Sequence, residues 1–153
     1  MNKFKIVVPM YNVEKWVKNT INTIKKQSYR NFECVIIDDI STDSSYSVVK
    51  ELIKDDDRFE LIKNTEKKFA LRNIYEGIEH LKPDVNDIVV TVDGDDWLYN
   101  YNVLEKVNQV YMQNNCFITY GISVYLDDLK KGLVMPNGSE PFPPQVVANS
   151  LFR

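Results

Sequence analysis

The feature that most constrains the fold is a regular alternation of short apolar runs with helical patterns. Apolar runs rich in β-branched residues occupy 4–8, 32–37, 59–62 and 88–92. Between and after them, apolar side chains recur at helical spacing over 12–27, 46–53, 69–81 and 103–111. This alternation predicts an α/β fold in which a mostly parallel central sheet is flanked by helices.

The pattern weakens toward the end of the chain. A strand is expected over 117–125, followed by a turn at 126–131 and a return at 132–135. From Pro136 onward, prolines and a glycine predict a loop. The chain ends soon after a short apolar run at 146–148. We therefore expect it to be the first part of a longer domain.

The charge balance bears on the kind of partner. The chain has 19 basic and 22 acidic residues and a net charge of −3, which argues against nucleic-acid binding. Apolar runs are about four residues long, whereas a transmembrane helix needs about twenty. The N-terminus lacks the features of a signal peptide. We expect a cytoplasmic protein, with peripheral contact at the inner face of the membrane left open.

Three polar clusters follow predicted strands, and the carboxyl ends of parallel strands are where ligands bind. The strongest cluster is Asp93-Gly94-Asp95-Asp96, after the fourth strand. Its carboxylates repel one another unless a cation or hydrogen bonds compensate, and they suit Mg²⁺ or Mn²⁺. An acidic surface turn is the alternative.

The second cluster is Asp38-Asp39, after the second strand. A carboxylate at this position accepts a hydrogen bond from a nucleobase N–H or a ribose hydroxyl. Asp39 suits a cap of the next turn equally well. Asp43 is better placed to cap the second helix, and we interpret it as structural.

The third cluster borders the first strand. Pro9 and Tyr11 offer a flat apolar wall on which a base could stack, or Tyr11 belongs to the core. Glu14 stands at the start of a helix, where an acid is favourable for the helix dipole alone. Further along, Arg72 suits either a diphosphate or a surface ion pair. The neighbouring Asn73 is interpreted as polar surface.

Two common phosphate-binding motifs are missing: G-x-G-x-x-G after the first strand, and G-x-x-x-x-G-K-[ST]. The motifs that are present are Val8-Pro9-Met10-Tyr11-Asn12-Val13-Glu14, Val35-Ile36-Ile37-Asp38-Asp39-Ile40-Ser41-Thr42-Asp43, Arg72-Asn73 and Val92-Asp93-Gly94-Asp95-Asp96. In this order and spacing they resemble the family 2 glycosyltransferases of the GT-A fold, over roughly residues 4–125.

The resemblance implies transfer of a sugar, with inversion, from a nucleotide-diphospho-sugar to an acceptor hydroxyl. A UDP-sugar donor, a glycan or lipid-linked acceptor, a role in bacterial surface polysaccharide synthesis and a Mn²⁺ or Mg²⁺ cofactor follow from it. It makes 1–125 the nucleotide-sugar-binding core of a single domain and 126–153 the start of the acceptor side. The alternative is a non-catalytic nucleotide-sugar-binding module or an inactive fragment of a transferase.

The resemblance also assigns roles to single residues. Pro9 and Tyr11 would border the base, Asp39 would hydrogen-bond it, and Glu14 would assist. Arg72 would approach the base or the diphosphate. Asp95 would be the main metal ligand. Asp93 would hold the metal or the ribose, and Asp96 would contact the donor sugar or support the loop.

The sequence departs from the family pattern in two places. Ile40 stands where the family usually has glycine, which predicts an altered turn. The stretch 67–71 lacks the glycine that often precedes the Arg-Asn pair. The family's catalytic base is an acidic residue well downstream of the metal motif, so we expect it beyond Arg153.

Overall fold

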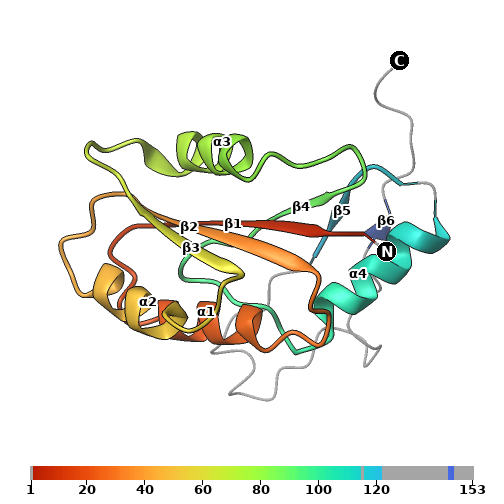
Figure 1. The fold of residues 1–153 in the computed structure, drawn as a ribbon, viewed down its shortest axis with the longest axis horizontal. Helices are drawn as coiled ribbons and strands as arrows, with labels where there is room; N and C mark the ends of the chain where they lie inside the picture. Colours follow the sequence, from red (N-terminus) through yellow and green to blue (C-terminus); the bar gives the residue numbers. More distant parts are fainter. Residues whose placement is uncertain (1, 115, 122–144, 147–153) are drawn as a thin grey trace. The chain divides into compact units, whose positions relative to one another are not determined.

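A computed structural model describes residues 2–114, 116–121 and 145–146 (Figure 1). Its centre is a sheet of four parallel strands in the order β3-β2-β1-β4. The strands are β1 (Phe4–Met10), β2 (Phe32–Asp38), β3 (Phe59–Lys63) and β4 (Ile88–Thr91). The predicted parallel α/β architecture is confirmed.

Helices cover both faces of this sheet. Figure 1 shows α1 (Val17–Lys25) and α2 (Ser45–Ile53) on one face, and α3 (Phe69–Leu81) on the other. The chain forms two compact units, Met1–Glu105 and Lys106–Arg153, and α4 (Val103–Gln113) runs from the first into the second. The domain limits expected from the sequence stay a prediction.

The second unit contains a short antiparallel pair, β5 (Thr119–Tyr120) with β6 (Gln145–Val146). Strand 117–125 was expected here, and only its central part is a strand among the described residues. The turn at 126–131, the return at 132–135 and the loop from Pro136 lie outside the described residues, apart from the short strand β6.

The core of the first unit lies on both faces of β1 and β2. Every residue of β1 is buried, because helices cover the sheet from both sides. Val7, Val35 and Ile37 form the face beneath α3. The opposite face packs against fully buried α1 residues such as Ile21 and Ile24. Burying each aliphatic side chain of this size contributes about 1.5–3 kcal/mol.

Two element boundaries differ from those expected. β1 continues through Pro9, whose missing N–H costs no ladder bond because β4 ends at Thr91, opposite Val7. Helix α1 begins at Val17 rather than at Asn12. Asn12 has a left-handed backbone with φ of 53°, and its side-chain oxygen accepts a hydrogen bond from Thr42 N–H. It therefore fixes the loop that precedes the helix.

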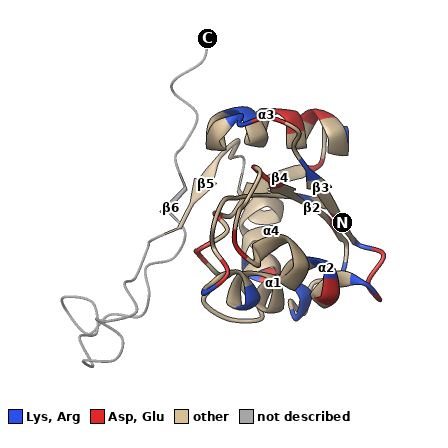
Figure 2. Ribbon diagram, turned by 90° about the vertical axis from the view of Figure 1, so that its left-hand side faces the viewer, with Lys and Arg blue, Asp and Glu red and all other residues tan. Residues whose placement is uncertain are grey.

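Charged side chains cluster on the outer elements. Figure 2 shows acidic and basic residues on the helices, with both signs on α3. None of the helices in the described part is long and apolar enough to cross a membrane. Both cysteines, Cys34 and Cys116, are buried free thiols.

Helix α3 approaches the sheet through Gly77, and this contact tests the packing. A methyl group at that position would lie 2.5 Å from Val7 Cγ1 and 3.1 Å from Ile37 Cδ1. We expect Gly77→Ala to destabilise the protein by about 1–3 kcal/mol, because overpacking forces the helix away from the sheet. Urea denaturation measures the change.

The matched control is Gly121→Ala, because a methyl group at that glycine would meet no atom within 4 Å. Equal effects of the two substitutions would show that contact with the sheet does not determine the result at Gly77.

Candidate nucleotide-sugar site

The three polar clusters meet where the carboxyl end of β1 bonds to both of its neighbours. Asp39 N–H donates to the Met10 carbonyl at 2.9 Å, and Gly94 N–H donates to the Pro9 carbonyl at 3.0 Å. These two bonds place the loops after β2 and β4 on either side of the same strand end. We call the three loops, 9–14, 38–45 and 92–96, the carboxyl edge.

The first two loops are joined by side-chain hydrogen bonds. The Glu14 carboxylate accepts from Ser44 N–H at 2.9 Å. Asp43 accepts from Glu14 N–H at 3.1 Å and from Ser45 N–H, the first residue of α2, at 2.9 Å. Burial acts to raise the pKa of Asp43, but these hydrogen bonds hold it below its usual value. The predicted structural role of Asp43 is confirmed.

The acidic loop after β4 is packed tightly against β1. A methyl group on Gly94 would lie 2.7 Å from Met10 Cβ and 3.2 Å from the Pro9 carbonyl oxygen. The Gly94 carbonyl also accepts from the buried Thr20 hydroxyl of α1, at 2.9 Å. Glycine is required here by this close approach, and it anchors the flanking aspartates at the edge.

Asp93, Asp95 and Asp96 are exposed, and no described side chain pairs with their carboxylates. Partial loss of hydration at the base of the loop, and then the charges of Asp95 and Asp96, raise the pKa of Asp93. The described residues contain no group of three or more His, Cys, Asp or Glu side chains able to hold a metal ion. Two carboxylates without protein cations still fit a hard ion that keeps water or phosphate oxygens as its other ligands.

Asp39, in contrast, is almost fully bonded within the protein. Its buried carboxylate accepts from Asn64 Nδ2 and Lys68 N–H, each at 2.8 Å, and from Phe69 N–H at 2.9 Å. Burial alone would raise the pKa of Asp39, but these donors hold it well below its usual range. Because Phe69 begins α3, Asp39 caps the helix that follows the next strand.

Two asparagines of this network were missed from the sequence. Asn73 was interpreted as polar surface, but it is fully buried and accepts from Asn64 Nδ2 at 2.8 Å. Its spacing of four residues from Gly77, on the face of α3 that contacts the sheet, was the available signal. Asn64 carries no motif, and only the fold brings it to Asp39.

The aromatic wall is half exposed and carries a lysine. Tyr11 is 47% exposed, so it is not a core residue. Lys67 Nζ lies 2.7 Å from the centre of the Tyr11 ring and 3.4 Å from the Asp39 carboxylate. The side chain of Lys67 is partly buried.

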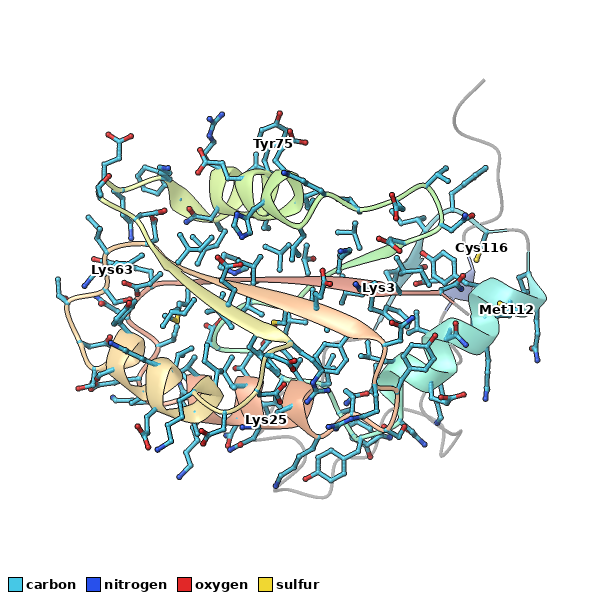
Figure 3. The ribbon with its side chains drawn as sticks, viewed as in Figure 1. Lys3, Lys25, Lys63, Tyr75, Met112 and Cys116 are labelled. Atoms are coloured by element: carbon cyan, nitrogen blue, oxygen red, sulfur yellow. The ribbon has the colours of Figure 1, made fainter. Side chains whose placement is uncertain are left out.

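Arg72 lies on the outer surface of α3. Its guanidinium pairs with Glu76 at 2.7 Å and lies 5.5 Å from the centre of the Tyr75 ring. Figure 3 shows Tyr75 pointing away from the sheet. The surface ion pair considered from the sequence is present, and within the described residues no contact joins Arg72 to Asp39 or to the acidic loop.

Both departures from the family pattern coincide with left-handed backbone. Ile40 has φ of 57° and Phe69 has φ of 64°. An altered turn was expected because Ile40 replaces a glycine. The backbone of Ile40 nevertheless has the left-handed conformation that favours glycine. For a β-branched residue this conformation is strained.

Ile40→Gly tests this strain. We expect the free energy of unfolding to rise by about 1 kcal/mol, because relief of the left-handed strain exceeds the entropy that glycine adds to the unfolded chain. Thermal denaturation measures the change. The control, Ile40→Val, keeps the β-branch and should bring no gain; a gain from both would exclude backbone strain as the cause.

The Asp39 network predicts how stability depends on pH. A lowered folded pKa means that the carboxylate stabilises the fold above its unfolded pKa of about 3.9, and that this stabilisation is lost as pH falls through the folded value. We expect Asp39→Asn to cost about 2 kcal/mol between pH 5 and 8, and less below about pH 4. Urea denaturation across pH measures both.

The exposed Asp57 provides the control, and Asp57→Asn should leave stability nearly unchanged. A cost of Asp39→Asn that stays constant down to about pH 2 would contradict a lowered pKa.

Known proteins resemble this chain over most of its length. Residues 5–139 match the model of the glycosyl transferase family 2. An uncharacterized glycosyltransferase of Haemophilus influenzae is 33% identical over 83% of this chain and 49% of its own. The GalNAc(5)-diNAcBac-PP-undecaprenol beta-1,3-glucosyltransferase of Campylobacter jejuni is 30% identical over 77% of this chain and 39% of its own. The chain thus spans half or less of these relatives.

Solved structures share the fold at lower identity. S. aureus TarS in complex with UDP-GlcNAc has a TM-score of 0.64 at 21% identity, over 80% of this chain and 36% of its own. The mannosyltransferase PcManGT of Pyrobaculum calidifontis, in complex with GDP-Man and Mn²⁺, has a TM-score of 0.67 at 20% identity, over 86% and 38%. Together, the match to the family model, the related sequences and this shared GT-A fold show that the chain belongs to glycosyl transferase family 2.

Proposed function

We propose that this chain holds the donor half of an inverting glycosyltransferase that uses a nucleotide-diphospho-sugar, with a UDP-sugar as the first candidate. The observation that carries the proposal is the meeting of the three loops at the end of β1, through the Met10–Asp39 and Pro9–Gly94 backbone bonds. These bonds bring an aromatic ring, a hydrogen-bonding carboxylate and an acidic loop to one sheet edge, where α/β folds bind ligands.

Each part of the carboxyl edge has a role in this proposal. The Tyr11 ring stacks on the base, beside Pro9, and Asp39 accepts a hydrogen bond from the base. These contacts are remote from the reacting carbon, and they fix its position. Glu14 supports the site by holding the loop that begins α2. Arg72 would have to leave Glu76 to reach a diphosphate.

The acidic loop is the proposed cation site. Asp95 and Asp93 would hold Mn²⁺ or Mg²⁺, and Asp96 would contact the sugar or support the loop. When bound, the ion stabilises negative charge on the departing nucleoside diphosphate as a Lewis acid. Asp93 and Asp95 repel each other without it, so the chain's own electrostatics favour a cation.

The acceptor side and the cellular role are also part of the proposal. An acceptor hydroxyl attacks the anomeric carbon from the face opposite the diphosphate, as a general base removes its proton. Relatives named for undecaprenol-linked glucosyl transfer and teichoic acid polymerisation support a glycan or lipid-linked acceptor in bacterial surface polysaccharide synthesis. A cytoplasmic location at the inner face of the membrane fits these acceptors.

Thermal denaturation with a panel of nucleotide-sugars, with and without Mn²⁺, tests donor binding. A specific donor raises the melting temperature by mass action. We expect Asp95→Asn to weaken Mn²⁺-dependent donor binding by about tenfold or more in calorimetric titration, because it removes a charged ligand. The control is Asp55→Asn in the other acidic run, which follows α2 instead of a strand.

Unchanged titration heats in Asp95→Asn would refute the metal site, and stabilisation by no nucleotide-sugar would refute the donor site. Slow donor hydrolysis separates an active centre from a binding module. Mn²⁺-dependent release of free sugar supports catalysis, whereas binding without release supports the module.

A further inference from the structure

We propose that Lys67 is a displaceable counter-ion, whose ammonium group holds the position on Asp39 that the donor base takes. The inference rests on the proposed function, because it concerns the same site. It goes further in stating that the nucleotide must compete with a side chain of this chain. Lys67 thereby sets the affinity for the donor.

The first step is the hydrogen-bonding capacity of Asp39. A carboxylate offers about four acceptor positions. Donors fixed by the fold fill three of them, since Asn64 Nδ2, Lys68 N–H and Phe69 N–H all lie within 2.9 Å. The buried Asn73 side chain also favours the ionised carboxylate and lowers the pKa of Asp39. These donors cannot leave without opening the start of α3 or the buried asparagine pair.

The fourth contact is of a different kind. Lys67 Nζ lies 3.4 Å from the second carboxylate oxygen, longer than the usual 2.7–2.9 Å of a charge-assisted hydrogen bond. It also lies 3.4 Å from the Asp39 backbone carbonyl. Lys67 has a flexible four-carbon stem and stands in the loop before α3. Of the contacts to the carboxylate, this one is therefore the easiest to exchange.

The second step is the position of the ammonium relative to Tyr11. Lys67 Nζ lies 2.7 Å from the centre of the Tyr11 ring, so it covers the ring face while it contacts Asp39. A base that stacks on Tyr11 and donates a ring N–H to Asp39 requires the same space. Like the base, the ammonium donates toward Asp39 and covers the face of the Tyr11 ring. When no nucleotide is bound, it also neutralises the buried charge of Asp39.

The third step is the energetic consequence. When Lys67 occupies the site in part of the molecules, the apparent dissociation constant for the nucleotide equals the intrinsic constant divided by the fraction of molecules in which the site is open. Removing the ammonium then tightens binding of an anionic nucleotide. Simple electrostatics predicts the opposite, because loss of a positive charge beside an anion weakens attraction. The direction of the change therefore distinguishes displacement from ordinary charge attraction.

Lys67→Met is the sharpest test, because it keeps the apolar stem beside Tyr11 and removes the charge. Calorimetric titration with UDP and with GDP, in Mn²⁺, should show about fivefold tighter binding of whichever nucleotide the unmodified chain binds. Lys67→Gln should act in the same direction. Lys67→Arg keeps the cation and should bind like the unmodified chain.

Lys63→Ala is the matched control. Lys63 stands at the end of β3 (Figure 3) and also lies over an aromatic ring, 5.0 Å from the centre of Tyr46. Within the described residues no hydrogen bond or ion pair joins its side chain to Asp39. Its substitution should leave nucleotide affinity unchanged. CDP serves as the ligand control: cytosine presents an acceptor where uracil presents N3–H, so it gains only the freed face of Tyr11, and its affinity should rise less than that of UDP in Lys67→Met.

The failures of the two proposals are distinguishable. If the unmodified chain binds UDP or GDP and Lys67→Met binds it equally or more weakly, Lys67 is not a competitor and this inference is wrong. If neither protein binds either nucleotide, the donor site itself is wrong, and the displacement falls with it.

Discussion

The structure of the site depends on backbone hydrogen bonds at the carboxyl end of β1. Parallel strands leave carbonyl groups at their ends, and here two consecutive ones, from Pro9 and Met10, accept from the loops after β4 and β2. No side chain is needed for this step, so it follows from the strand order alone. The position of each functional side chain at the edge is then determined by the loop to which its residue belongs.

The alternation of strands and helices was sufficient to predict the sheet, the helices and the edge at which the polar clusters lie. Apolar periodicity determines which face of each element is buried, and that property is local in sequence. The predicted positions of Asp39 and of the acidic loop at one edge follow, because parallel strands end on the same side. The roles of single site residues stay predictions.

Other parts of the site depend on contacts between distant segments and were not predictable. The Asn64–Asn73 pair joins the loop after β3 to α3, and Lys67 reaches Asp39 across 28 residues. Neither follows from local spacing. The left-handed residues were predictable in part. A glycine in the family pattern indicates that the backbone at that position has a positive φ, and Ile40 keeps the positive φ although it is not a glycine. Neighbouring contacts, including the Asn12–Thr42 hydrogen bond, hold the turn in this conformation, although it is strained for a β-branched residue.

Asp39 shows how one carboxylate serves both the fold and a site. A buried charge is tolerated only when most of its acceptor positions are filled, and the start of α3 fills two of them with backbone N–H groups. The same donors keep the group ionised, and an ionised carboxylate accepts a hydrogen bond but cannot donate one. Capping the helix therefore determines which partner the free position accepts. That partner is a donor, an N–H, an O–H or an ammonium, and in our proposal the Lys67 ammonium supplies it until a ligand replaces it.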